Sequence, residues 1–177
     1  MCTLAAGMGR PKAGEYDPYY ERYISLVASD DIVSTLEKQA QETKALLGRL
    51  SAQQGDFRYA PGKWSVKEVL AHVNDTERIM SYRTLRVSRG DKTPIEGFEQ
   101  DDYVANGKFD RRTIADLLEE FAAIRNATVQ LLRHFDVEAG ERLGIANQKQ
   151  ISARALAYII AGHELYHRRI LQEKYLK

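Results

Sequence analysis

Four stretches of the chain place apolar residues every three or four positions, with charged residues between them. This pattern is typical of amphipathic helices that pack around a common core. The stretches cover about residues 31–50, 66–89, 111–135 and 153–176. They predict an all-α protein built as a four-helix bundle. No segment of the chain shows a convincing strand pattern.

Capping residues locate the starts of three of these helices. One of the aspartates at 30–31 can cap the first helix, Asp110 the third and Ser152 the fourth. Each of these side chains accepts a hydrogen bond from a backbone N–H of the first turn, which would otherwise lack a partner.

The second helix has the most complete start signal. Ser65 is followed three residues later by Glu68, and together they can form a capping box. Trp64, directly before the box, can staple onto Val69. This helix then runs to about residue 89.

The remaining segments are connections and an N-terminal arm. Residues 90–109 carry three glycines and a proline and show no sustained period, which predicts a covering loop or a crossover. Residues 136–151 form a second loop. We expect residues 1–29 to be an arm packed on the domain and residues 30–177 to be the bundle. The arm would be held by its tyrosines, which are Tyr16, Tyr19, Tyr20 and Tyr23.

Three of the four histidines lie on the inward stripes of their helices. His163 and His167 are about one turn apart on the last helix, and His72 lies on the second. A buried imidazole needs a partner for each ring nitrogen, and a shared metal ion is one way to provide it. Packing with ordinary hydrogen bonds is the alternative. His134 falls off the stripe of the third helix at its C-terminal turn, where the helix dipole favours a partly charged imidazole, so we do not expect it to be a ligand.

The heights of the histidines predict how the helices are connected. With a rise of 1.5 Å per residue, His72 lies about 10 Å along the second helix, and His163 and His167 about 16 and 22 Å along the fourth. The three reach nearly one level only if these helices are antiparallel. A moderate loop makes the third and fourth helices antiparallel, so the second and third must run parallel. The predicted topology is up-down-down-up, with residues 90–109 as a long crossover between the second and third helices.

The last helix also matches the His-Glu-x-x-His signature of zinc metalloproteases. Those enzymes take a third ligand from downstream, often after a glycine that breaks the helix. Here Ile170 continues the helical pattern, so a third protein ligand must come from upstream. The glutamate of this signature is Glu164, which is a candidate catalytic residue. The alternative is that Glu164 is exposed or supports the neighbouring ligands. Glu68 and Asp75, which flank His72, are candidate acceptors for its ring.

Composition narrows the class of protein. The 26 basic and 25 acidic residues are mixed along the chain, which argues against a nucleic-acid surface. No apolar run approaches the roughly 20 residues of a membrane span, and we find no export signal. The single cysteine, Cys2, allows neither an internal disulfide nor a cysteine zinc site. We expect a cytoplasmic protein, and Met8 offers an alternative start.

The chain resembles the DinB/YfiT-like proteins, a family of small metal-dependent enzymes. The resemblance covers nearly the whole chain after Met8 and rests on segments that occur in the expected order. These are residues 14–23, 59–65, 70–78, 97–101 and 155–164 together with His167.

The resemblance implies a four-helix bundle with a crossover between its second and third helices. It also implies that His72, His163 and His167 are the metal ligands. Some relatives are S-transferases that attach a low-molecular-weight thiol, such as bacillithiol or mycothiol, to electrophiles. Others were named as hydrolases, and relatives often form homodimers.

Our first hypothesis is an enzyme that acts on a small molecule. Three imidazoles with an open position suit a divalent transition metal, zinc or nickel, which would activate a bound thiol or water. In the transferase version of this hypothesis the bound group is the sulfur of a low-molecular-weight thiol co-substrate, and in the hydrolase version it is hydroxide. The alternatives are a non-catalytic metal- or ligand-binding stress-response protein and a partner-binding helical module without metal. Asp101, Tyr103 and Asn106 are pocket candidates if the crossover covers the site.

Overall fold

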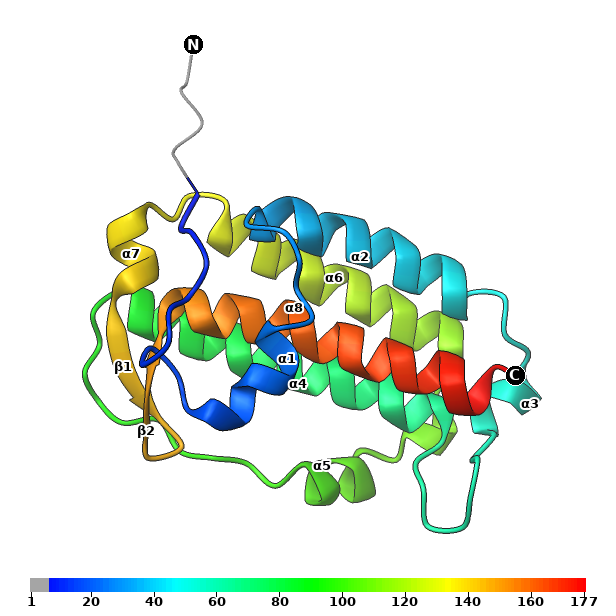
Figure 1. Ribbon diagram of the computed structural model, residues 1–177. Helices are drawn as coiled ribbons and strands as arrows, with labels where there is room; N and C mark the ends of the chain where they lie inside the picture. Colours follow the sequence, from blue (N-terminus) through cyan, green and yellow to red (C-terminus); the bar gives the residue numbers. More distant parts are fainter. Residues whose placement is uncertain (1–6) are drawn as a thin grey trace.

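The computed structural model describes residues 7–177. In this part of the chain four long helices form a bundle: α2 (Ile32–Leu47), α4 (Val66–Ser88), α6 (Ile114–Leu132) and α8 (Ala153–Ile170). Both α4 and α2 pack against α6 and α8. Figure 1 shows α2 and α8 running in one direction and α4 and α6 in the other. The predicted up-down-down-up bundle is confirmed.

Three of the predicted helix starts are confirmed. The side chain of Asp31 accepts a hydrogen bond from the first turn of α2, and that of Ser152 does the same for α8. Ser65 and Glu68 form the full capping box at the start of α4. The polar residues at these positions therefore fix where the chain turns into the bundle.

The predicted cap of the third helix is wrong. Asp110 lies in a short 3-10 helix, Phe109–Arg111, and α6 begins after Thr113, whose hydroxyl accepts the backbone N–H of Asp116. The Asp110 carbonyl instead accepts a hydrogen bond from Lys67. A threonine three residues further on supplies the same capping chemistry, and the inward stripe of α6 starts directly after it.

The crossover after α4 is only partly irregular. It contains α5 (Gln100–Gly107), which the sequence did not predict, and Figure 1 shows it passing along the outside of the bundle beside α4. A shorter helix, α3 (Ala52–Asp56), lies between α2 and α4. The crossover is fastened near Ile95, whose backbone N–H donates to Ile145 and whose carbonyl accepts from Asn147.

The loop prediction for residues 136–151 is wrong. This segment contains α7 (Val137–Glu141) and a hairpin of β1 (Leu143–Ala146) and β2 (Lys149–Ser152). The two turn residues, Asn147 and Gln148, both have positive φ, 49° and 62°. Such two-residue turns match the twist of antiparallel strands. The turn lacks the glycine that usually marks it, which is why the pattern was missed.

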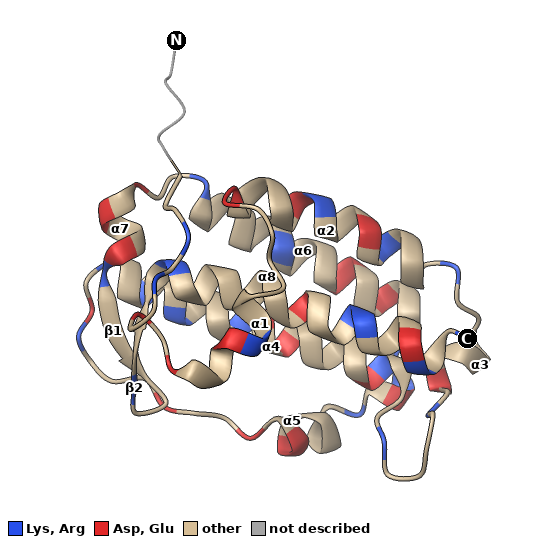
Figure 2. Cartoon of the chain, in the orientation of Figure 1, with Lys and Arg blue, Asp and Glu red and all other residues tan. Residues whose placement is uncertain are grey.

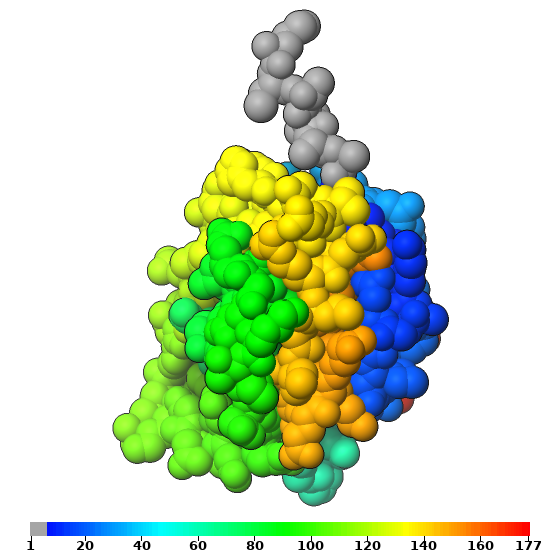
Figure 3. Space-filling view, turned by 90° about the vertical axis from the view of Figure 1, so that its left-hand side faces the viewer, coloured from blue at the N-terminus to red at the C-terminus, as the bar shows by residue number. Residues whose placement is uncertain are grey.

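The N-terminal segment packs on the last helix. It contains the 3-10 helix Pro18–Tyr20 and α1 (Glu21–Ile24), which contacts α8. Gly162 permits this contact, because a Cβ there would lie 2.1 Å from the carbonyl oxygen of Tyr23. Figure 3 shows the crossover, the hairpin and the N-terminal segment side by side on one end of the molecule.

The surface carries no charge block in the described residues. Figure 2 shows basic and acidic residues interspersed along the helices. The helices of residues 7–177 also fall short of the length and apolar character that a membrane span needs. Beyond the π-helical turn Leu171–Tyr175, which continues α8, no further element follows in the described chain.

Candidate metal centre

The structure brings the three predicted histidines together where α4 and α8 pack. Their ligand-capable atoms all lie within 4.8 Å of one another. The Nε2 atoms of His72 and His163 are 3.0 Å apart, and the ring centres of His163 and His167 are 4.4 Å apart. Because α4 and α8 are antiparallel, the three rings lie at nearly the same height in the bundle, as the helix rise predicted. His134 is exposed beyond the end of α6 and has no part in the cluster.

Burial keeps the three imidazoles uncharged. It lowers the pKa of His72 to about 4. Burial and the neighbouring His72 lower the pKa of His167 to about 3, and burial also holds the pKa of His163 well below its ordinary value. All three rings are therefore neutral near pH 7, which is the form that offers a lone pair to a metal.

The donor set fits a divalent metal ion. Zinc binds imidazole nitrogen at about 2.0–2.1 Å, so its nitrogens lie about 3.3 Å apart in a tetrahedral site. The Nε2 atoms of His72 and His163, 3.0 Å apart, are near that separation. A hydrogen bond between His72 and His163 would use one N–H and leave the third ring without a comparable partner. Three imidazoles also leave at least one coordination position for another group.

Aromatic rings surround the histidines and fix their orientation. The ring of Trp64 lies 4.9 Å from that of His72, and the ring of Tyr23 lies 5.3 Å edge-on to that of His163. Tyr166 packs at 5.4 Å against His167. The sequence predicted Trp64 as a staple for the helix start and gave it no place at this cluster.

The two carboxylates proposed to orient His72 have other positions. Glu68 binds both Nη atoms of Arg58 and the backbone N–H of Ser65. Asp75 lines a separate, more open cavity beside α5, together with Tyr103 and Asn106. Among the hydrogen bonds of the described residues, neither carboxylate reaches His72. Glu68 binds the backbone of Ser65 rather than His72, because Ser65 is only three residues away and the two residues form the capping box.

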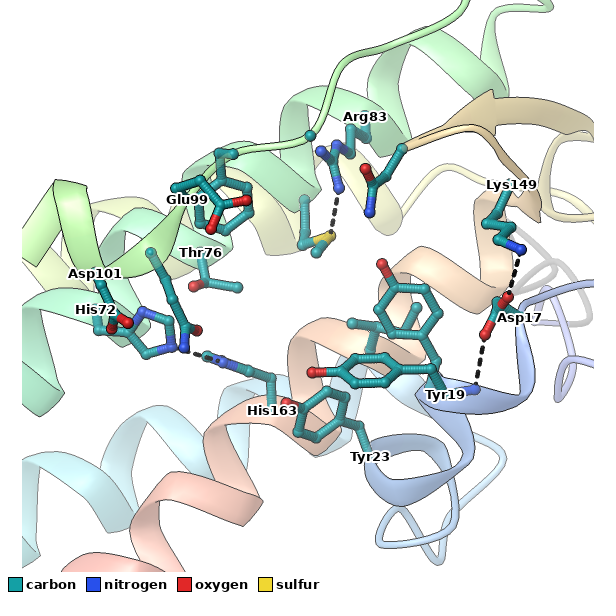
Figure 4. Close-up of a pocket in the computed structure, with 17 residues that line it drawn as sticks. Asp17, Tyr19, Tyr23, His72, Thr76, Arg83, Glu99, Asp101, Lys149 and His163 are labelled. Atoms are coloured by element: carbon teal, nitrogen blue, oxygen red, sulfur yellow. Dashed lines mark hydrogen bonds and ion pairs between the residues drawn. The ribbon is translucent and has the colours of Figure 1, made fainter.

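A cavity of about 400 Å³ opens beside the cluster. His72 and His163 lie at one end of it, and Figure 4 shows Tyr19 and Tyr23 facing Thr76 across it. The crossover forms its outer wall with residues 97–101, which include the predicted pocket residue Asp101. The other lining residues are Asp17, Tyr20, Met80, Arg83, Asn147, Lys149 and Ile159. A cavity of this size accommodates a small organic molecule.

Glu164 faces the interior of the bundle. Its side chain is 2% exposed, so the exposed alternative is wrong. Its carboxylate accepts hydrogen bonds from the Thr43 hydroxyl and from Nη2 of Arg125, and Arg125 also binds Glu77. Glu164 is not among the described residues that line the cavity. With Arg125 and Glu77 it forms a closed ionic cluster, which we call the closed cluster.

No function was predicted from the sequence for Thr76 and Arg83. Both lie on the inward stripe of α4 and line the cavity. Their position could have indicated a function, because both are polar residues on the inward, mostly apolar face of a helix. The same feature identified the histidines as candidates.

Comparison with known proteins places this geometry in context. The family model described as the DinB superfamily matches residues 35–171. The solved structure of YfiT from Bacillus subtilis superposes with a TM-score of 0.74 at 18% sequence identity, covering 94% of each chain. YfiT is described as a probable metal-dependent hydrolase with an unusual four-helix bundle topology. At this identity the likeness shows a shared fold. No curated protein matches the sequence significantly.

Proposed function

Because the chain belongs to the DinB superfamily, we propose that it is a metal-dependent enzyme acting on a small molecule. In this proposal His72, His163 and His167 hold one divalent transition metal, zinc or nickel. The observation that carries the proposal is the convergence of three neutral imidazoles, two of which, His72 and His163, line a cavity of about 400 Å³. Neutral nitrogen donors with an open position are the usual arrangement of a catalytic zinc site.

A divalent metal at this position would supply a Lewis acid that lowers the pKa of a bound thiol or water toward neutrality. The residues around it provide orientation. Trp64 and Tyr23 pack against the rings of His72 and His163 and hold them in place. The cavity reaches His72 and His163, so a substrate would approach the cluster from there.

The favoured reaction is transfer of a low-molecular-weight thiol to an electrophile. The only cysteine of the chain is Cys2, so the described cavity has no sulfur nucleophile of its own and a thiol would be a co-substrate. Among the described residues, no carboxylate hydrogen-bonds to the histidine cluster as a positioned base. A thiol activated by the metal does not need such a base.

A small-molecule hydrolase is the second candidate. Glu99 and Asp101 line the same cavity as His72, from the side of the crossover. Either carboxylate could accept a proton from a water molecule during hydrolysis. This candidate therefore depends on the crossover, whereas the transferase depends on an added thiol.

Elemental analysis of the purified, untagged protein tests the metal site. We expect about one divalent transition metal per chain, most of which is lost in His72→Ala. His134→Ala is the matched control, because it removes an exposed imidazole of the same chain and should retain the metal. Equal metal content in the wild type and His72→Ala would overturn the ligand assignment.

Thiol dependence separates the two reactions. For a transferase, a low-molecular-weight thiol should perturb the visible spectrum of the cobalt-substituted protein, and turnover of a haloarene or epoxide should require that thiol. For a hydrolase, esters or amides should be cleaved without thiol, and thiols should inhibit. A spectrum that responds to neither thiol nor substrate would contradict both and would support the non-catalytic alternative.

A further inference from the structure

Arg83 is a buried cation at the end of the cavity away from the histidines. Its side chain is 2% exposed. Nη2 donates to the carbonyl of Glu96 at 2.6 Å, Nη1 lies 3.8 Å from the sulfur of Met80, and Nε has no partner. No carboxylate of the described residues forms an ion pair with it. Burial lowers its pKa, and the partial opposing effect comes from Tyr20 rather than from an acid.

A purely structural role does not account for this arrangement. Arg83 does hold the crossover, through the Glu96 carbonyl and through Phe98, whose ring centre is 5.9 Å from the guanidinium. One carbonyl, however, accounts for one of five N–H groups, and neither contact neutralises the charge. A buried charge without a counter-ion is costly, so residues in such positions are normally paired.

A second polar group lies between Arg83 and the histidines. The hydroxyl of Thr76 is buried, lines the cavity and has no hydrogen-bond partner in the described chain. His72, Thr76 and Arg83 share one face of α4, and Figure 4 shows them along one side of the cavity. Eleven residues separate His72 from Arg83, which is about 16 Å along the helix axis and about 20° around it.

We infer that the cavity binds a small organic acid lengthwise along α4, with its carboxylate paired to the Arg83 guanidinium and a polar group of its chain hydrogen-bonded to Thr76. The planar guanidinium matches a carboxylate with two parallel hydrogen bonds. The other end of the acid points to the histidine cluster, and this orientation alone rests on the proposed function.

The charges around the cavity favour a carboxylate over a phosphate. The second basic residue of the lining, Lys149, already lies 3.5 Å from Asp17. Glu99 and Asp101 add negative charge on the crossover side. A single unpaired guanidinium therefore suits a monoanion, whereas a dianion would be repelled about twice as strongly by Glu99 and Asp101.

Calorimetric titration with two matched probes tests this inference. The probes are ω-mercaptoalkanoic acids and ω-mercaptoalkanols of equal chain length, titrated into the metal-loaded and the metal-free protein. We expect the acids to bind at least about tenfold more tightly than the alcohols in both forms, because hydrogen bonds to charged groups are commonly worth that much. The ratio should fall to about one in Arg83→Met.

Two further variants guard against a loss of folding or a general charge effect. Arg83→Gln keeps a donor for the Glu96 carbonyl but removes the charge, and it should lose the acid preference in the same way. Arg86→Met is the matched control, because Arg86 lies one turn further along α4, pairs with Asp91 and does not line the described cavity. It should keep the preference.

The outcomes separate the inference from the proposed function. Thiols that bind the metal-loaded protein without any preference for the acid would overturn the inference and leave the metal site intact. An equal loss of preference in Arg86→Met would also overturn it. An acid preference that depends on Arg83, in a protein whose metal content is unaffected by His72→Ala, would support the inference and contradict the metal assignment.

Discussion

Two arginines are buried to the same degree in this bundle and have opposite surroundings. Arg125 on α6 is 1% exposed and Arg83 on α4 is 2% exposed. Arg125 binds both carboxylate oxygens of Glu77 at 2.8 Å, Glu164 at 2.7 Å and the Leu36 carbonyl at 3.0 Å. Arg83 has one carbonyl, one sulfur and one aromatic ring as neighbours.

The two arginines mark two kinds of region. The cluster around Arg125 stabilises the fold, whereas the cavity around Arg83 can bind a ligand. Burial lowers the pKa of both guanidinium groups, but Glu77 and Glu164 outweigh it at Arg125 and raise that pKa overall. The closed cluster is satisfied within the chain. The cavity leaves the guanidinium of Arg83 to be neutralised by something else. The helix α8 lies between them, since His163 faces the cavity and Glu164, the next residue, faces the closed cluster.

Removing the charge of the closed cluster should have the largest effect on stability. Arg125→Met leaves Glu77 and Glu164 buried without their partner, and breaking a buried ion pair typically costs about 3–5 kcal/mol. We expect a loss of this size in the free energy of unfolding, measured by urea denaturation followed by circular dichroism. Arg133→Met, at the C-cap of the same helix, is the control, because its pair with Glu37 is half exposed and should be worth less than about 1 kcal/mol. Equal effects of the two substitutions would contradict the comparison.

A methyl group at the contact between α1 and α8 should have the next largest effect. Helix propensity alone favours Gly162→Ala by about 1 kcal/mol. The new Cβ would lie 2.1 Å from the backbone oxygen of Tyr23, which cannot move as a side-chain tip can. Overpacking commonly costs about 1–3 kcal/mol, so we expect a net loss in unfolding free energy. Gly7→Ala, where nothing lies within 4 Å, is the control. A more stable Gly162→Ala protein would show that α1 is not held as described.

The cavity arginine should be nearly dispensable for folding. Arg83→Met removes an unpaired buried charge together with one hydrogen bond to a carbonyl, so the lost contact and the relieved desolvation oppose each other. We expect the unfolding free energy of the ligand-free protein to stay within about 1 kcal/mol of the wild type. A loss as large as that of Arg125→Met would mean that the two arginines have the same role.

Chelation should leave the bundle folded, which is the smallest of these effects. The apolar faces of the four long helices are buried without help from an ion, and a domain of this length has enough core to fold alone. We expect the far-ultraviolet circular dichroism spectrum to be unchanged after dialysis against a chelator. Loss of helical signal would instead indicate folding that depends on metal, as in a zinc finger.

The sequence predicted those features that depend on local spacing. The Ser65–Glu68 box, the inward stripes and the common level of the histidines all follow from residues a few positions apart or from the helix rise. The closed cluster could not be found in this way, because Arg125 lies 48 residues from Glu77 and 39 from Glu164. On the sequence alone Arg125 was one more charged residue on a helix. The hairpin was not predicted because its turn residues, Asn147 and Gln148, adopt positive φ although neither is glycine, the residue that usually indicates such a turn.

The wall of the cavity has a consequence for the order in which the protein assembles. The segment that carries Tyr19 and Tyr23 is tied to α8 by the ion pair of Glu15 and Arg154, residues 139 positions apart. Contacts between distant residues close large loops and form slowly compared with local helical contacts. During refolding, helical signal should therefore return before the N-terminal segment docks. A bundle can be fully helical while its binding cavity still lacks one wall, and the rate at which ligand binding is recovered reports that last docking step.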